Sequence, residues 1–157
     1  MSAKDTAPTC FDVAKFFLAY QDEDAGDTIS NLKLQKLCYY AQGFTLAITG
    51  KPLFPEKIEA WAHGPVCPAL YHEYKAHQAK AIPKPKESLH DICDKFSEEQ
   101  IGILREVWEA YGQFSAWKLR DMTHEEPPWR NAFHGDPVST ETITQDAMYD
   151  YFKTQVA

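Results

Sequence analysis

Cys67 and His63 are the side chains whose types and spacing come nearest to covalent chemistry. Cys67 lies near the expected start of a helix at about Val66, where the helix dipole lowers the pKa of a thiol. His63 lies four residues earlier and could serve as a base, and His124 would complete the set that a small Cys/His-dependent hydrolase needs. The sequence offers no identifiable group to orient the histidine. Cys67 can equally be a small residue that packs in the interior.

Metal, phosphate and cofactor chemistry lack their spacing signatures. His124-Glu125 begins like a helical HExxH zinc motif, but Pro128 stands where the second histidine would be. His90 and Cys93 have a ligand-like spacing, yet no second pair follows at zinc-finger distance. The seven glycines are dispersed and form no phosphate-binding loop. We therefore expect no metal site, no cofactor and no enzymatic activity.

The elements that must position these residues are mainly helical. Apolar spacing predicts a mainly α, compact single domain over residues 1–157, with about six helices and at most one short β-strand or hairpin. Alternation over 57–62 predicts the strand, and His63-Gly64-Pro65 is expected to end it. Residues 21–27 read as an acidic turn, and 78–90 as an exposed loop or flexible arm. The expected helices cover 11–20, the segment from Ser30 or Asn31 to Gly50, a segment from about Val66, Ser97 to Gly112, Ser115 to Met122, 129–133 and a terminal segment from Thr144.

Charge and cysteine usage narrow the class of protein. The chain has 16 lysines and arginines against 23 aspartates and glutamates, a formal net charge of −7, which disfavours nucleic acid and favours a basic partner. Its four cysteines are widely spaced, which fits reduced thiols in a cytoplasm. The sequence has no signal-peptide pattern and no run of about 18 apolar residues, so we expect a cytoplasmic protein without a membrane span.

Three clusters have compositions that helical amphipathicity does not explain. In Leu34-Gln-Lys-Leu-Cys-Tyr-Tyr-Ala41, a lysine and two tyrosines lie on a helix otherwise suited to burial, where their polar atoms must either find partners or extend to the surface. Ala60-Trp-Ala-His-Gly-Pro-Val66 is a sharp strand-to-helix junction with glycine and proline side by side. Thr123-His-Glu-Glu-Pro-Pro-Trp129 places a histidine and a tryptophan on either side of a rigid double proline.

In this order and at these separations, the clusters resemble the SocA-like antitoxin family, or Panacea domain, which includes phage-associated GepA-like proteins. The LQKLxYYAQG, GPV and THxxxPW patterns carry the resemblance, which extends over residues 9–154. It implies an α-rich domain that neutralises a cognate bacterial or prophage toxin by direct protein–protein binding. It also implies that toxin and antitoxin genes are neighbours. One branch of the family delivers its toxin to a Clp-type protease, so an adaptor role is the alternative within this class.

The resemblance also implies which residues matter. Aromatic, glycine and proline positions usually define a fold, so most of the matching residues are expected to be scaffold. The polar members are better candidates for surface contacts, and we expect a contact face that combines Trp61 and His63 with the turn from His124 to Trp129. A homodimer is compatible with the sequence. The matching or candidate toxin-binding residues are Leu34, Lys36, Leu37, Tyr39, Tyr40, Ala41, Trp61, His63, Gly64, Pro65, Val66, Tyr71, Thr123, His124, Pro128 and Trp129.

Overall fold

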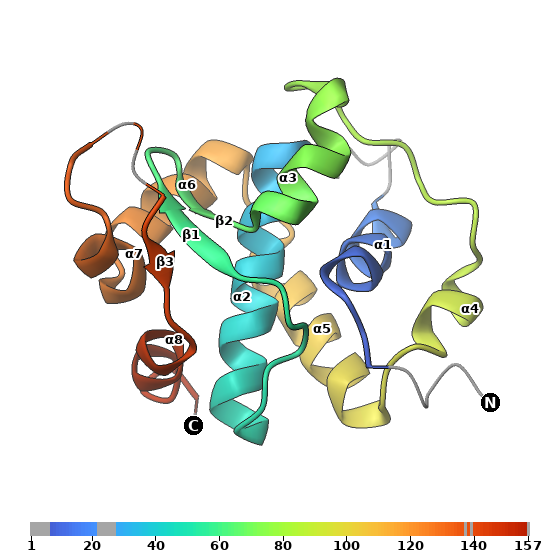
Figure 1. The fold of residues 1–157 in the computed structure, drawn as a ribbon. Helices are drawn as coiled ribbons and strands as arrows, with labels where there is room; N and C mark the ends of the chain where they lie inside the picture. Colours follow the sequence, from blue (N-terminus) through green and yellow to red (C-terminus); the bar gives the residue numbers. More distant parts are fainter. Residues whose placement is uncertain (1–6, 22–27, 137, 139, 157) are drawn as a thin grey trace.

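The computed structural model describes residues 7–21, 28–136, 138 and 140–156. Within these residues the chain forms eight α-helices, one short 3-10 helix and three short strands (Figure 1). The elements are α1 (Cys10–Tyr20), α2 (Asn31–Thr49), β1 (Ile58–Trp61), β2 (Gly64–Val66), α3 (Pro68–Tyr74), η2 (Lys75–His77), α4 (Leu89–Cys93), α5 (Glu98–Tyr111), α6 (Ala116–His124), α7 (Pro127–Ala132), β3 (Thr142–Ile143) and α8 (Gln145–Phe152).

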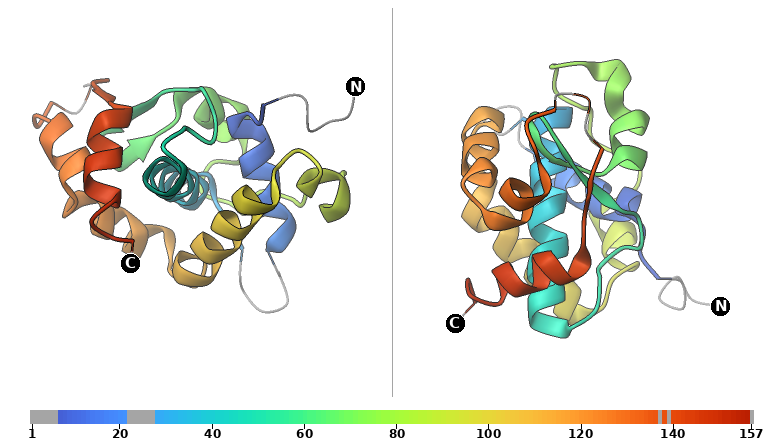
Figure 2. Two further views of the ribbon diagram at one scale, coloured as in Figure 1. Left: turned by 90° about the horizontal axis from the view of Figure 1, so that it is seen from below. Right: turned by 60° about the vertical axis from the view of Figure 1, so that its left-hand side comes forward.

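Helix α2 runs through the centre of the molecule, and the other elements surround it. It packs against α1, α3, α5, α6, α8 and β2, and the view along its axis shows it enclosed on several sides (Figure 2, left). Fourteen of its 19 residues are buried, and these include polar residues as well as the apolar stripe. A helix buried on all sides has no solvent face for its polar side chains, so each of them needs an internal partner.

Local signals set the helix ends. The side chain of Ser30 caps the start of α2 by accepting a hydrogen bond from the backbone N–H of Lys33. Gly50 ends the same helix with a φ of 76°, a conformation that glycine adopts at little cost. Helices α5 and α6 begin at the capping residues Ser97 and Ser115, as the sequence predicts.

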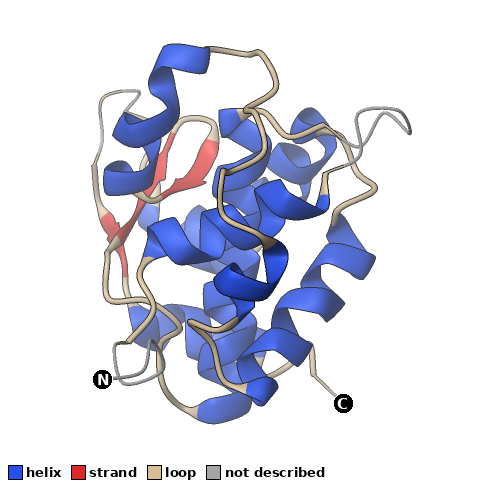
Figure 3. Cartoon of the chain, turned by 90° about the vertical axis from the view of Figure 1, so that its right-hand side faces the viewer, coloured by secondary structure: helices blue, strands red, loops and turns tan. Residues whose placement is uncertain are grey.

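The strands form a small antiparallel sheet in the order β2-β1-β3 at one side of the helices (Figure 3). The register pairs Trp61 with Gly64 across a two-residue turn, and Ile58 with Ile143 on the other side of β1. The prediction that His63-Gly64-Pro65 merely ends one strand is therefore wrong, because Gly64 and Pro65 belong to a second strand. β3 is only two residues long and reaches β1 from the far end of the chain, so it leaves no periodicity to detect.

Three other sequence predictions need correction. The count of about six helices is slightly low, because the five-residue α4 begins at Leu89, within the segment 78–90 interpreted as a loop. The segment 78–90 is not a free arm, since Ile82 is buried, its backbone N–H donates to the carbonyl oxygen of Ile29, and its carbonyl oxygen accepts from the side chain of Gln21. The helix expected from about Val66 begins at Pro68 instead. Most of the acidic turn expected at 21–27 lies outside the described residues.

No helix in the described part of the chain is both long enough and apolar enough to span a lipid bilayer.

The contact between α2 and α8 yields a test of the fold. Replacing Gly43 by alanine has two opposing effects. Alanine is the better helix former, but its Cβ would overlap the ring of Phe152. We expect Gly43→Ala to lower the free energy of unfolding by about 1–3 kcal/mol, because the overlap outweighs the gain in helix propensity. Urea denaturation measures the difference.

Gly102 in α5 is the matched control, since a Cβ there would have no neighbouring atom within 4 Å. Gly102→Ala should raise the free energy of unfolding by about 0.5–1 kcal/mol. Equal stabilisation by both substitutions would contradict the packing of Phe152 on α2.

Candidate functional site

The three sequence clusters meet at the side chain of Lys36. Lys36 is fully buried on α2, and its Nζ donates a hydrogen bond to the carbonyl oxygen of Pro65 at 3.1 Å. A Cβ on Gly64 would lie 2.7 Å from Cε of Lys36 and 2.9 Å from Oγ1 of Thr123. Gly64 also has a φ of 108°, which residues with side chains rarely adopt. The Gly64-Pro65 strand and the end of α6 are therefore packed on α2 through this lysine.

Burial lowers the pKa of Lys36 to about 7, and the positive charge of Arg120 acts in the same direction. Within the described residues, no carboxylate forms an ion pair with Lys36. The neutral amine still donates to Pro65, so its burial needs no counter-ion. The sequence reasoning expected a partner for this polar head group, and the structure supplies a backbone carbonyl.

Trp129 joins the α6–α7 segment to the β-hairpin. Its indole Nε1 donates to the carbonyl oxygen of Trp61 at 2.7 Å, and its side chain is almost completely buried. The ring stacks on His124, with centroids 3.9 Å apart and an angle of 2° between the planes. Pro128 is buried beside it at the start of α7. This half of the predicted contact face is therefore built mainly into the interior.

The surroundings of His124 disfavour its charged form. Burial lowers the pKa of its imidazole, and the charges of Arg120 and Lys36 lower it further. Its Nε2 is buried without a hydrogen-bond partner among the described residues. A charged imidazolium would need partners for both nitrogens, so this arrangement favours the neutral ring at neutral pH.

Tyr39 and Tyr40 belong to a second buried polar group, around Glu126. The hydroxyl of Tyr40 donates to Oε2 of Glu126 at 2.9 Å, and its ring stacks on Tyr111 with centroids 4.0 Å apart. Burial raises the pKa of Glu126 to about 7, although the hydrogen bond from Tyr40 opposes the shift. The hydroxyl of Tyr39 and Oε1 of Glu126 have no partner among the described residues. The sequence analysis did not single out Glu126, because an acidic residue in a turn carries no burial signal.

Beside this interior lies an open groove with a volume of about 620 Å³, which we call the hairpin groove. Four residues predicted from the sequence line it: Trp61, His63, Val66 and Tyr71. The rings of Trp61 and Tyr71 meet edge to face, with centroids 5.0 Å apart. The other predicted residues do not line the groove; they are Leu34, Lys36, Leu37, Tyr39, Tyr40, Ala41, Gly64, Pro65, Thr123, His124, Pro128 and Trp129.

The groove also contains a residue that the sequence analysis missed, Trp117 at the start of α6. Its side chain is 58% exposed, the largest exposure of any tryptophan in the described chain. It meets His63 edge to face at 5.7 Å, and Arg120 lies over its ring at 5.3 Å. Its position in the sequence could have indicated this exposure, because Trp117 does not lie on the helical face that buries Leu119 and Thr123.

A chain of hydrogen bonds from α2 supports the groove wall formed by α3. Gln35 Oε1 accepts from the backbone N–H of Cys67 at 2.9 Å, and its Nε2 donates to Asn31 at 2.9 Å. Asn31 in turn donates to the carbonyl oxygen of Tyr71 at 3.2 Å. The start and the middle of α3 are thus held on the buried helix, and the Tyr71 ring has a defined place.

Cys67 is buried and does not line the groove. A hydrogen bond with Cys10 lowers the pKa of its thiol, and backbone N–H groups at the start of α3 act in the same direction. The expected helix N-terminus is therefore present, but the thiol is closed off from solvent. No hydrogen bond joins Cys67 to His63, whose Nδ1 instead accepts one from Arg120.

Within the part of the chain that the structure describes, no three histidine, cysteine or acidic side chains are grouped closely enough to hold a metal ion.

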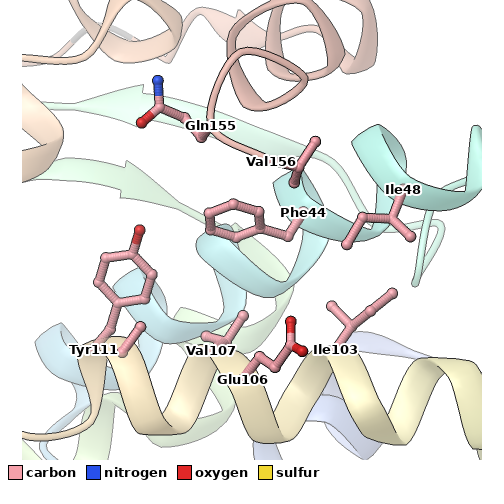
Figure 4. Close-up of a pocket in the computed structure, with 9 residues that line it drawn as sticks. Phe44, Ile48, Ile103, Glu106, Val107, Tyr111, Gln155 and Val156 are labelled. Atoms are coloured by element: carbon pink, nitrogen blue, oxygen red, sulfur yellow. The ribbon is translucent and has the colours of Figure 1, made fainter.

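A second pocket, of about 520 Å³, lies between α2 and α5 and is bordered by the residues that follow α8 (Figure 4). Phe44 and Ile48 face Ile103 and Val107 across this pocket, and the carboxylate of Glu106 also borders it. No residue of the three sequence clusters lines this pocket.

The buried amine of Lys36 yields a prediction of pH dependence. Its pKa is about 7 in the folded chain and about 10.5 when exposed, so between these values the unfolded chain holds the extra proton. Stability should therefore rise with pH across this window, by up to about 1.4 kcal/mol per pH unit from this group. Urea denaturation at several pH values should show this slope in the native chain and its loss in Lys36→Met.

Lys51→Met, at an exposed position, controls for replacing a lysine by methionine. If Lys36→Met and the native chain change in stability equally from pH 7 to 10, the amine is not buried as described.

The chain is similar to known proteins over its central part. Residues 34–130 match the family model described as "Antitoxin SocA-like, Panacea domain". The protein named Antitoxin SocA from Caulobacter vibrioides (strain NA1000 / CB15N) is 40% identical over 110 residues, which cover 64% of this chain and 58% of that protein. The chain thus matches less than two thirds of that relative's length. No solved structure matches.

The family match covers more than half of the chain and includes Lys36, the Gly64-Pro65-Val66 strand and the segment from Thr123 to Trp129. The chain therefore belongs to the SocA-like antitoxin family with a Panacea domain.

Proposed function

We propose that this chain is an antitoxin that neutralises one cognate toxin in the cytoplasm by binding it directly. Membership of an antitoxin family supports the role, as does the similarity to the protein named Antitoxin SocA. The action is binding rather than catalysis. The best candidate nucleophile of the chain, Cys67, is buried away from solvent. Within the described residues, no histidine forms a hydrogen bond with it.

The hairpin groove is the surface on which we place the toxin. The observation that carries this choice is the exposure of Trp117 beside Trp61 and Tyr71, where three aromatic side chains line one concave surface. Tryptophan and tyrosine supply much of the binding energy at protein interfaces when they fill pockets that exclude water. The buried family residues then act as the support that holds this surface in shape.

Truncating these aromatic residues should weaken neutralisation. The toxin in this test is the product of the neighbouring gene, expressed with the antitoxin in the same cells. We expect Trp61→Ala and Trp117→Ala each to weaken the complex by about tenfold or more, which restores growth arrest at low antitoxin levels. Growth and copurification of the two proteins are the measurements.

Tyr149→Ala on α8 is the matched control, because it removes another exposed aromatic ring that does not line the groove. Thermal unfolding establishes that each variant is folded. Full neutralisation by folded Trp61→Ala and Trp117→Ala would place the toxin elsewhere on the chain. If the neighbouring protein does not arrest growth when it is expressed alone, the antitoxin proposal itself is wrong.

The lifetime of the toxin separates occlusion from delivery to a Clp-type protease. Occlusion leaves the toxin stable in the complex, so its half-life should be the same in cells with and without the protease. A half-life that lengthens only when the protease is removed would show the adaptor mechanism instead.

A further inference from the structure

We infer that the hairpin groove takes an acidic, apolar segment of the partner, in which a carboxylate lies next to one or two large apolar side chains. This inference rests on the proposed function only in assigning that segment to the toxin. It differs from what the net charge of the chain suggests, because a protein of charge −7 favours a basic partner overall.

The groove has a local charge opposite in sign to that of the whole chain. Among the described residues, no aspartate or glutamate lines it, whereas Lys75 does. Lys75 is exposed and forms no ion pair within the described chain. A partner carboxylate at this place would gain a cation without breaking an existing pair.

Of the acidic side chains near the groove, Asp136 accepts a hydrogen bond from the backbone N–H of the lining residue Val138 at 3.0 Å, and three others are engaged or face elsewhere. Asp121 pairs with Arg120 at 3.0 Å. Glu59 is buried, where it pairs with Lys57 at 3.0 Å and accepts from the indole of Trp61 at 2.9 Å. Glu73 is only two residues from Tyr71 on α3, so it lies on the opposite side of that helix from the groove. None of these four carboxylates lines the groove, whereas Lys75 does.

The rest of the lining requires apolar groups in the same segment. Trp61, Tyr71, Val66 and Trp117 give the groove an apolar lining. A volume of about 620 Å³ lies within the range of pockets that enclose ligands of drug size, roughly 300–1,000 Å³, so it can hold more than one side chain. Apolar side chains adjacent to one carboxylate match this combination of surfaces.

The backbone that carries Lys75 is anchored on α2. Gln78 lines the groove next to η2 and has a φ of 54°, a conformation that costs a residue other than glycine about 1–3 kcal/mol. Lys75 lies one helical turn beyond Tyr71, whose backbone is bound to Asn31. An anchored backbone and aromatic wall lose little freedom when a segment binds.

Nucleic acid also combines negative charge with flat apolar groups, but the observations favour a protein segment. The groove has few cations, and a chain with an excess of acidic residues repels a polyanion. A single carboxylate on a partner protein does not meet the repulsion that a polyanion meets. We therefore make oligonucleotide binding an outcome that would overturn the inference.

The test uses labelled probe peptides and the full chain, with fluorescence anisotropy as the measurement. The acidic probe is an acetylated hexapeptide that alternates aspartate with leucine or phenylalanine, and the basic probe has lysine in place of aspartate. We expect the acidic probe to bind about tenfold more tightly than the basic one at low salt. Trp117→Ala should weaken binding of the acidic probe by about tenfold.

Lys75→Glu should abolish or reverse this preference, since it places a like charge beside the probe carboxylate. Lys84→Glu is the matched control, because Lys84 is exposed and does not line the groove. Equal binding of both probes, no binding up to millimolar concentration, or tighter binding of a ten-nucleotide single-stranded DNA would each overturn the inference.

Failure of the inference and failure of the proposed function give different results. If the acidic probe binds with the expected preference but the neighbouring protein is not a toxin, the groove chemistry holds and the antitoxin role fails. If the toxin is neutralised equally by native chain, Lys75→Glu and Trp117→Ala, and no probe binds, the antitoxin role holds and the groove inference fails.

Discussion

A lysine with no exposed surface must either find hydrogen-bond partners or lose its charge, and Lys36 does both. Its pKa falls to about 7, and its amine donates to the carbonyl oxygen of Pro65. This requirement brings the Gly64-Pro65 strand against α2, and the close approach excludes a side chain at Gly64. Thr123 packs on the same spot from α6. Three parts of the chain that are distant in sequence are therefore positioned by one buried amine.

Features set by local chemistry could be predicted from the sequence. Ser97, Ser115 and Thr144 cap helices as expected, because a side-chain oxygen at a helix start acts on the backbone only a few residues away. The family resemblance is also confirmed, because its patterns coincide with positions where the backbone or the packing permits few alternatives. Gly64 is the plainest example, since both its φ and its neighbours exclude other residues.

Features that depend on tertiary assembly could not be predicted. β3 exists only because Ile143 returns to pair with Ile58, and two residues show no alternation. The hairpin groove combines Trp61, Lys75 and Trp117 from three separate elements, so its positive character is hidden in a sequence whose total charge is negative. Sequence reasoning placed Trp129 on the expected contact face, but only tertiary contacts could reveal its almost complete burial under the hairpin.

The residues that hold the fold around Lys36 are buried, whereas the hairpin groove is exposed, so the two can change separately during evolution. Trp117 and Lys75 face solvent, so replacing them alters the proposed binding surface while the contact between Lys36 and Pro65 remains intact. Surface substitutions away from special features usually change stability by less than about 0.5 kcal/mol. The domain can therefore exchange one partner for another through a few substitutions, without first acquiring a new core.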